Sequence, residues 1–311
     1  MRLFRHLHEI PSSAQDAVLA IGNFDGVHLG HQAIIQEAGK IAIGSSRPLA
    51  VMSFEPHPRQ FFRPLDPPFR LTTFTDKFRL LKEQGVELLF CLPFNRQLAS
   101  VTAVEFVEKI LTGVLRAGHI VVGYDFIFGH RRQGNAALLQ HYAEGKAFGL
   151  TVVPPVTSAN GEIYSSTKVR EALMNGDVKT AQNILGRSWH INGFVRHGDK
   201  RGRELGFPTA NISLPKAVLR PAYGVYAVWV KIAGSPQLIP GAANFGRRPT
   251  IAGAQPELLE VHLLDFSGDL YGQKLEVAFQ HYLRPEARFN NLEELRRQIG
   301  IDCQKARALL A

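Results

Sequence analysis

The stretch IGNFDGVHLGHQAII, residues 21–35, joins a short apolar run to an amphipathic segment through a turn rich in Gly and Asp. The apolar run predicts a buried strand, and the segment that begins near Gly30 predicts a helix. Glycine lets the backbone approach a ligand closely, and the free N–H groups of a helix N-terminus attract anions. We therefore expect a phosphate-binding turn here, with His28 and His31 facing the bound group.

Two imidazoles at this position can donate hydrogen bonds to phosphate oxygens. Such donors stabilise the charge that develops when a nucleophile attacks the α-phosphate of a nucleoside triphosphate. The histidines could instead be structural residues of the helix start, or zinc ligands, although zinc would need a third ligand that neither Cys91 nor Cys303 supplies. The other residues of the turn that we expect to contact a nucleotide are Gly22, Asn23, Phe24 and Asp25.

The surroundings of the turn predict an α/β domain. Apolar runs that read as buried strands lie at residues 17–22, 48–54, 87–93, 119–123 and 150–155. They alternate with helical patterns, which predicts a Rossmann-like parallel sheet with helices on both faces and ligands beyond the carboxyl ends of the strands. In the helix expected over residues 75–85, we expect Phe78, Leu81 and the aliphatic stem of Lys82 to share the buried face.

The pattern changes after Gly186. Strand-like segments separated by Gly and Pro follow at residues 189–196, 224–232, 238–246, 258–266 and 274–283. They predict a small antiparallel barrel or sandwich. A C-terminal helix is expected over residues 290–310, with Leu292, Ala306 and Leu309 among the residues of its apolar stripe. We place the boundary near Gly186, which gives domains 1–186 and 187–311.

Composition narrows the class of protein. The chain has 311 residues, of which 45% are hydrophobic and 20% are charged, as in an ordinary globular protein of two domains. No apolar run approaches the ~18 residues of a membrane span, and the first residues lack the apolar core of a signal peptide. Two cysteines suggest no disulfide framework. We expect a cytoplasmic protein without a membrane partner, monomeric or weakly homo-oligomeric.

The net charge of +9 predicts an affinity for anions. The densest basic cluster, Lys200, Arg201 and Arg203, is diluted by Asp199 and Glu204. This distribution favours nucleotides or phosphorylated substrates, and we expect no nucleic-acid partner.

The stretch HGDKRGRELGFPTANI, residues 197–212, combines glycines and basic residues in a second candidate phosphate site. Thr209 and Asn211 are two residues apart, so on a strand their side chains point to the same face. A hydroxyl and an amide oxygen together suit Mg²⁺ that bridges nucleotide phosphates. A plain turn before a β-favouring Thr explains the residues equally well. The candidate nucleotide-binding residues of the loop are Gly198, Lys200 and Arg203.

Two segments of the first domain resemble signatures of the nucleotidyltransferase superfamily. GNFDGVHLGH resembles the H-x-G-H signature, and YSSTKVREAL, residues 164–173, resembles its Ser/Thr-rich helix start followed by a basic residue. Without the first signature, the second would be read as an ordinary helix N-cap. The resemblance implies phosphate contacts from Ser165, Ser166, Thr167 and Arg170.

Two further segments narrow the resemblance to the adenylyltransferase module of bacterial FAD synthetases. They are SFEPHPRQFF, residues 53–62, and GYDFIFGHRRQGN, residues 123–135. This resemblance implies that His57 and Phe62 help to shape the flavin pocket. It also implies that Asp125 contacts the nucleotide, at a position where family members often have Asn. The alternative is a proline-marked loop with phenylalanines in the core.

GFPTANI, residues 206–212, resembles the P-T-A-N motif of riboflavin kinases, which are antiparallel barrels. The resemblance implies that Glu260 is the general base for the ribityl hydroxyl and that Arg284 and Phe289 contact the flavin. His262 is the local competitor for the role of base, and a core position is the alternative for Phe289.

Together these resemblances imply a bifunctional enzyme. Riboflavin and ATP would give FMN and ADP in the barrel, and FMN with a second ATP would give FAD and pyrophosphate in the first domain, both steps with Mg²⁺. One rival is a nucleotidyltransferase for another phosphorylated alcohol, fused to a barrel that only binds; the set Thr209, Asn211 and Glu260 disfavours it. A nucleic-acid-binding regulator is the other, and the barrel lacks the alternating aromatic and basic pattern that it needs.

Overall fold

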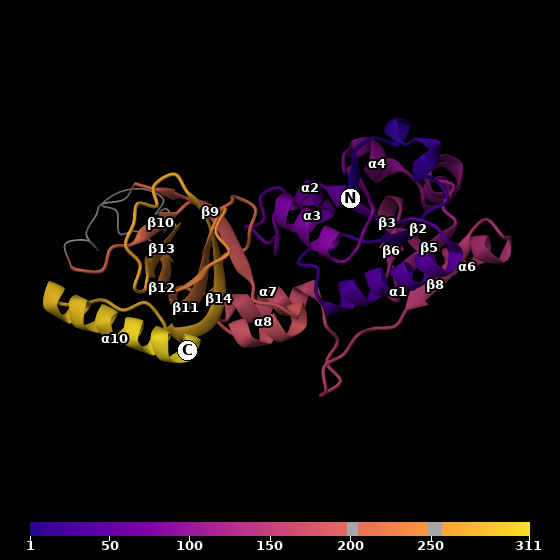
Figure 1. Ribbon diagram of the computed structural model, residues 1–311. Coiled ribbons are helices and arrows are strands. Elements are labelled where there is room, and N and C mark those ends of the chain that lie inside the picture. The colour runs from indigo at the N-terminus through magenta and orange to yellow at the C-terminus, as the bar shows by residue number, and fades with distance from the viewer. Residues whose placement is uncertain (198–204, 248–256) are drawn as a thin grey trace. The chain divides into compact units, whose positions relative to one another are not determined.

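The computed structural model describes residues 1–197, 205–247 and 257–311 (Figure 1). The chain divides into two compact units, each with its own hydrophobic core. The first unit comprises Met1–Pro67 and Phe74–Ser165, and the second comprises Pro68–Thr73 and Ser166–Ala311. Among the described residues, no helix is both long enough and apolar enough to cross a membrane.

The first unit is built on a parallel sheet of six strands in the order β1-β4-β3-β2-β5-β8. The strands are β1 Arg2–Phe4, β2 Val18–Ile21, β3 Leu49–Glu55, β4 Leu88–Pro93, β5 His119–Gly123 and β8 Gly149–Val153. All of their pairings are parallel, which confirms the predicted α/β fold. The direction of the strand order reverses between β2 and β5, and ligands of such sheets bind at the carboxyl ends of the strands at this switch point.

The longer helices of the first unit connect these strands. They are α1 Leu29–Ser45, α3 Phe74–Glu83 and α6 Ala136–Glu144, together with the short α2 Pro58–Phe62 and α4 Arg96–Ser100. After α4 the chain forms the short α5 Ala103–Glu105, which continues as the π-helix η3 Phe106–Val114. A small hairpin of β6 Ile127–Phe128 and β7 Gly134–Asn135 follows β5.

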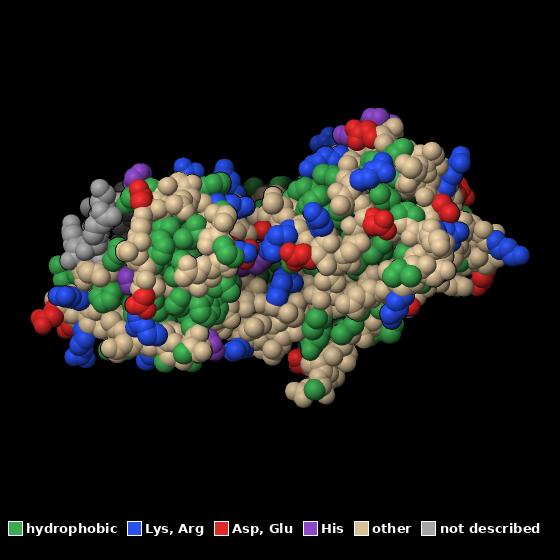
Figure 2. Space-filling view, in the orientation of Figure 1, with side chains coloured by type: hydrophobic (Ala, Val, Ile, Leu, Met, Phe, Trp, Pro, Cys, Tyr) green, Lys and Arg blue, Asp and Glu red, His purple; other side chains and the backbone are tan. Residues whose placement is uncertain are grey.

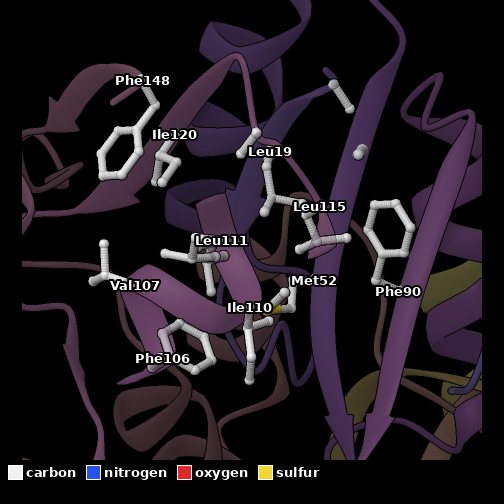
Figure 3. Packing of buried hydrophobic residues seen from close by; sticks show 14 of the residues in the cluster. Leu19, Met52, Phe90, Phe106, Val107, Ile110, Leu111, Leu115, Ile120 and Phe148 are labelled. Atoms are coloured by element: carbon white, nitrogen blue, oxygen red, sulfur yellow. The ribbon is translucent and has the colours of Figure 1, made fainter. Parts of the chain in front are cut away.

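The core of this unit lies on both faces of the sheet. On one face, Phe106 of η3 packs in a cluster with Met52 of β3 and Phe90 of β4 (Figure 3). On the other face, Ile35 of α1 and Leu81 of α3 belong to a second cluster with strand residues. Burial on both faces explains why these strands are almost continuously apolar.

One prediction for α3 was wrong. Lys82 is exposed, whereas Lys77, only 1% exposed, is buried on the inner face with Leu80 and Leu81. A pattern of apolar residues cannot identify a buried lysine, because burial of an ammonium depends on polar partners from other parts of the chain.

The second unit contains a closed antiparallel barrel in the order β10-β13-β12-β11-β14-β9. Its strands are β9 His190–Arg196, β10 Ala210–Ile212, β11 Gly224–Ile232, β12 Leu238–Arg247, β13 Glu257–Leu263 and β14 Lys274–Arg284. Of the two predicted arrangements, the barrel is therefore correct and the sandwich is not. On β13, Leu259, Val261 and Leu263 are buried, and Glu260 and His262 between them are partly exposed, so this strand alternates between its two faces.

Helix α10, Leu292–Leu310, covers part of the outer surface of the barrel (Figure 1). Its residues Cys303 and Ala306 pack with Ala227 and Ala242 of β11 and β12. The predicted apolar stripe holds in the middle of the helix but is wrong at its ends, because Leu292 is 70% exposed and Leu309 48% exposed. The unit also contains α7 Ser166–Met174 and α8 Val178–Leu185, and α8 packs against β14.

A short segment between α2 and α3, Pro68–Thr73, belongs to the second unit. The N–H of Arg70 donates to the carbonyl of Ala217 at 2.9 Å, and the N–H of Leu219 donates to the carbonyl of Arg70 at 2.8 Å. The indole N–H of Trp189 donates to the carbonyl of Leu71 at 2.9 Å. These backbone contacts attach the segment to the barrel unit.

Candidate active sites

The first candidate site is the turn that follows β2. The backbone has positive φ at Phe24 (49°), Gly26 (85°) and Val27 (42°), and α1 begins at Leu29. Positive φ at two residues other than glycine marks a tightly constrained loop. Phe24 and Asp25 are buried, with exposures of 0% and 1%. The turn lies at the carboxyl end of β2, next to the switch point of the sheet.

His28 and His31 form a stacked pair at the start of α1. Their ring centroids are 3.7 Å apart, and the Nδ1 of His28 accepts the backbone N–H of His31 at 3.3 Å as the helix N-cap. Because Nδ1 is the acceptor, a neutral His28 carries its proton on Nε2. A Cβ at Gly30 would lie 3.0 Å from Cε1 of His28, so glycine leaves room for this ring. These contacts fix the orientation of the His28 ring at the start of α1.

Asp125 lies directly after β5, the strand that pairs with β2. Its side chain is exposed, and its Oδ1 would be 3.2 Å from a Cβ placed on Gly123. Since β2 and β5 are parallel neighbours, Asp125 and the turn at Phe24 leave the sheet at the same edge.

The predicted flavin-binding residues His57 and Phe62 lie on α2, which follows β3. His57 is the N-cap of this helix, and its Nδ1 accepts the N–H of Arg59 at 3.1 Å. Phe62 is 64% exposed, and its ring packs edge-to-face on Phe61 and Phe94, with centroids 5.2 and 5.6 Å away. An exposed ring supported by other rings is suited to stacking on a planar ligand.

The Ser/Thr-rich segment begins α7. Ser165 ends the first unit, and Ser166, Thr167 and Arg170 belong to the second. The Nε of Arg170 donates to the carbonyl of Phe69 at 2.8 Å, and its guanidinium lies 5.4 Å from the centroid of the Phe69 ring. Arg170 thus holds the Pro68–Thr73 segment, a contact that the sequence did not predict.

The second candidate site is a row of polar side chains across three barrel strands. Asn211 on β10 is registered opposite Glu260 on β13, and Glu260 is registered opposite Asn244 on β12. Side chains directly opposite each other in a ladder lie on the same face of the sheet. Thr209 immediately precedes β10, so the predicted metal-ligating and base residues are brought together.

Asn244 is a candidate site residue that the sequence analysis missed. Its place in the row depends on strand pairing, which the spacing of residues along the chain does not reveal.

His262 is the next outward-facing residue of β13 after Glu260. One of its ring nitrogens, Nδ1, is 2.8 Å from the carbonyl oxygen of Pro208, and its ring meets Phe207 edge-on at 5.5 Å. Since a carbonyl only accepts, Nδ1 carries the proton of this hydrogen bond. His262 therefore fixes the backbone just before Thr209.

Arg284 and Phe289 are close to each other, with the guanidinium 5.8 Å from the ring centroid. Arg284 is also paired with Asp302 of α10: its Nε and Nη2 lie 3.0 and 2.7 Å from the carboxylate Oδ2. Asp302 is only 3% exposed. Asp302 could not be identified from the sequence, because an acidic residue on an amphipathic helix is normally expected on the solvent side.

Three predicted nucleotide-binding residues, Gly198, Lys200 and Arg203, lie outside the described residues. Within the described part of the chain, no group of three or more His, Cys, Asp or Glu side chains could hold a metal ion. The donors at the barrel row are instead a hydroxyl, amide oxygens and one carboxylate. This set fits a hard divalent cation that takes its remaining ligands from phosphate and water.

A parallel α/β domain with a constrained turn and a histidine pair at its switch point, followed by a closed barrel with a carboxylate registered opposite two amides, is the architecture expected of a nucleotide-dependent transferase with two sites. Comparison with known proteins agrees. Residues 10–168 match the family model for FAD synthetase, and residues 185–310 match that for riboflavin kinase. The chain belongs to the family of bifunctional riboflavin kinase/FMN adenylyltransferases. It is an enzyme of flavin cofactor biosynthesis.

Individual relatives match over their full length. The bifunctional riboflavin kinase/FMN adenylyltransferase of Pseudomonas fluorescens is 44% identical over 311 residues, which cover 100% of this chain and 98% of the relative. The protein of the same name from Escherichia coli (strain K12) is 42% identical, over 99% and 97% of the two chains. A crystal structure from Streptococcus pneumoniae, described as a macrolide-efflux protein, is 33% identical with a TM-score of 0.88 and covers 98% of both chains.

Proposed function

We propose that the chain makes FAD from riboflavin in two ATP-dependent steps at two separate sites. The barrel transfers the γ-phosphate of ATP to the ribityl hydroxyl of riboflavin, which gives FMN and ADP. The parallel-sheet domain then transfers the adenylyl group of a second ATP to FMN, which gives FAD and pyrophosphate. The two family matches, one in each half of the chain, support this division of labour.

The observation that carries the kinase step is the register that puts Glu260 opposite Asn211. The nucleophile of this step is a neutral hydroxyl, so Glu260 accepts its proton while the oxygen attacks the γ-phosphorus. The oxygens of Thr209 and Asn211 would hold Mg²⁺. When bound, Mg²⁺ neutralises charge on the nucleotide phosphates.

The kinase substrates have further proposed contacts. Arg284 and Phe289 form one side of the flavin site, with Asp302 holding the guanidinium in place. Nucleotide contacts are also proposed for Gly198, Lys200 and Arg203, which precede Thr209 in the sequence.

The adenylyl step needs no general base, because the attacking phosphate of FMN is already an anion. His28 and His31 stabilise the charge that develops on the α-phosphate, with the Nε2–H of His28 as one donor. The N-terminus of α1 adds its N–H groups and its dipole. Further nucleotide contacts are proposed for Gly22, Asn23, Phe24, Asp25, Asp125, Ser165, Ser166, Thr167 and Arg170, and flavin contacts for His57 and Phe62.

We also propose a functional boundary near Gly186, giving domains 1–186 and 187–311, next to residue 185 where the riboflavin kinase match begins. A cytoplasmic location, a monomeric or weakly oligomeric state and the lack of a nucleic-acid partner remain predictions. On the face shown in Figure 2, Lys and Arg side chains are interspersed with Asp and Glu, which argues against an extended basic surface on that face.

The test is a time course in which the purified protein is incubated with riboflavin, ATP and Mg²⁺ and the flavins are separated by chromatography. FMN should appear first and then give way to FAD. Accumulation of FMN without FAD would contradict the adenylyl step, and lack of any conversion by folded protein would contradict both steps. A salt-dependent complex with RNA would instead favour the nucleic-acid-binding alternative.

A further inference from the structure

Lys77 of α3 is buried with its ammonium group at the ends of two neighbouring strands. Its side chain is 1% exposed, and its Nζ lies 3.0 Å from the hydroxyl of Ser53 and 3.0 Å from a carboxylate oxygen of Glu55. The backbone carbonyl of Asn23 is 3.5 Å from the same Nζ. Burial of a charge is costly unless it is paired and hydrogen-bonded, and here the protein supplies both a countercharge and polar partners.

These contacts show what the ammonium can do. A lysine ammonium has three N–H donors and no acceptor, and Lys77 has three protein acceptors within reach. Its donors are therefore directed at the protein and not at a substrate phosphate. Lys77 can act on the reaction only through the residues that it holds.

Lys77 reaches Asn23, in the turn after β2, directly at 3.5 Å and through the hydroxyl of Ser53 at 3.0 Å. The Asn23 carbonyl also accepts the hydroxyl of Ser53 at 3.1 Å, so Lys77, Ser53 and Asn23 form a closed set of hydrogen bonds. In a trans peptide the next N–H, that of Phe24, points opposite to this carbonyl. The Phe24 N–H has no hydrogen-bond partner among the residues that the structure describes.

The Asn23 carbonyl, which accepts the hydrogen bonds of Lys77 and Ser53, is next to a constrained part of the backbone. Phe24 has a φ of 49°, a left-handed conformation that costs energy in a bulky residue unless neighbouring contacts hold it. The hydrogen bonds from Ser53 and Lys77 to the Asn23 carbonyl keep the turn in this conformation. They also keep the Phe24 N–H directed away from Lys77 and available to a ligand oxygen.

The second residue that Lys77 holds, Glu55, ends β3 and leads into the segment of His57 and Phe62. Lys77 thus connects the turn proposed for the nucleotide with the segment proposed for the flavin. We infer that Lys77 is a positioning residue for adenylyl transfer, which sets the geometry of the Asn23–Phe24 peptide relative to the end of β3. This inference rests on the proposed function of the first domain.

The test compares full-length variants Lys77→Met, Ser53→Ala and the double variant, with Lys82→Met as a control on the exposed side of α3. FMN adenylylation and riboflavin phosphorylation are measured separately, with kcat and KM for each and a thermal unfolding curve. Lys77→Met should lower kcat for adenylylation about tenfold to a hundredfold, as expected for a shift of reacting groups by a fraction of an ångström to one ångström. Riboflavin phosphorylation should be unchanged, and Lys82→Met should leave both reactions unchanged.

The kcat of the double variant, compared with the two single variants, tests whether Lys77 and Ser53 act through the same carbonyl. Ser53→Ala should lower kcat less than Lys77→Met does, and it should add little in the Lys77→Met background because both side chains hold the same carbonyl. Additive losses, or unchanged adenylylation kinetics in Lys77→Met below its unfolding temperature, would overturn the inference. An equal loss of both activities would also overturn it, because it would indicate a general structural role.

If Lys77→Met does not fold, the variant that combines Lys77→Met with Glu55→Gln removes both charges of the Lys77–Glu55 pair. A persistent loss of kcat in this variant supports positioning, whereas restored kcat would show that Lys77 only neutralises Glu55. Wild-type protein that forms no FAD from FMN would contradict the proposed function itself. Measuring the wild type therefore distinguishes a wrong function for the first domain from a wrong role for Lys77.

Discussion

Glu260 of β13 lies directly opposite Asn211 of β10 in the antiparallel barrel. Directly opposed residues in such a ladder have Cβ atoms about 4.5–5.5 Å apart. A carboxylate and an amide therefore share one small area of the barrel surface, although they come from distant parts of the chain. The proposed kinase step requires such an arrangement, a base for the hydroxyl beside oxygen ligands for the metal ion of the nucleotide.

Replacing Glu260 by Gln keeps the shape of the side chain but removes the base. Riboflavin phosphorylation should fall about 10²- to 10⁴-fold, the usual contribution of general base catalysis. Conversion of supplied FMN to FAD should be unaffected. Initial rates with each flavin separately would measure this, and a Glu260→Gln enzyme that phosphorylates riboflavin normally would show that another group, such as His262, is the base.

Asn211→Ala should weaken the divalent metal site of the kinase. The Mg²⁺ concentration for half-maximal riboflavin phosphorylation should rise about tenfold or more, comparable to losses seen when groups around a metal site are removed. Excess Mg²⁺ should restore much of the rate. The Mg²⁺ dependence of FMN adenylylation in the same protein is the internal control, and identical titration curves for variant and wild type would exclude Asn211 as a ligand.

His28→Asn separates two roles of this histidine. Asparagine is a good N-cap, so α1 should remain capped and the protein should stay folded. Loss of the Nε2–H donor should lower FMN adenylylation about 10²- to 10³-fold, as for other preorganised donors, and His31→Ala should have an effect of similar size. Riboflavin phosphorylation should not change. If His28→Asn adenylylates FMN at the rate of the wild type, the ring of His28 serves only as the N-cap of α1.

We expect the raised pKa of the Cys303 thiol to make the protein less stable at alkaline pH. Burial, with a smaller contribution from the charge of Asp302, raises the pKa of this thiol to about 11. Below the ordinary thiol pKa of roughly 8.5–9, both the folded and the unfolded chain carry the proton, and the contribution to stability is complete. Between pH 9 and 11 only the unfolded chain loses it, so the free energy of unfolding falls as pH rises.

The measurement is urea unfolding of the wild type and Cys303→Ala between pH 7.5 and 10.5. The difference in stability between the two proteins should be constant up to about pH 8.5 and should then shift in favour of the alanine variant. A difference that stays constant over the whole range would contradict the raised pKa.

Asp302→Ala should destabilise the second unit, because it leaves the guanidinium of Arg284 without its carboxylate partner. The side chains are 21% and 4% exposed, so the loss should be on the order of 3 kcal/mol. Asp265→Asn is the control: it removes the charge pair with Arg307 of α10, where the side chains are 75% and 51% exposed, and asparagine tolerates the left-handed backbone of Asp265 (φ 55°). That change should cost less than about 1 kcal/mol, and equal losses in the two variants would contradict the distinction.

Much of the fold could be predicted from local patterns. Five of the six strands of the parallel sheet were predicted to within two residues, as at β5, because parallel strands covered on both faces are continuous apolar runs. The short edge strand β1 was not predicted. The same kind of pattern was wrong for Lys82 in α3 and for Leu292 in α10. In these helices the pattern could not show which turns would lie against the rest of the protein.

The two kinds of domain and the motifs that identify the family could be recognised in the amino-acid sequence, since periodicity and short motifs are properties of neighbouring residues. Three relationships became visible only in the folded protein: Asn244 lies in one row with Asn211 and Glu260, the buried Lys77 contacts the Asn23 carbonyl, and Asp302 holds Arg284. Each of these relationships pairs residues from different strands or helices. Strand register and the packing of a helix face set such pairs, and the spacing of residues along the chain contains neither.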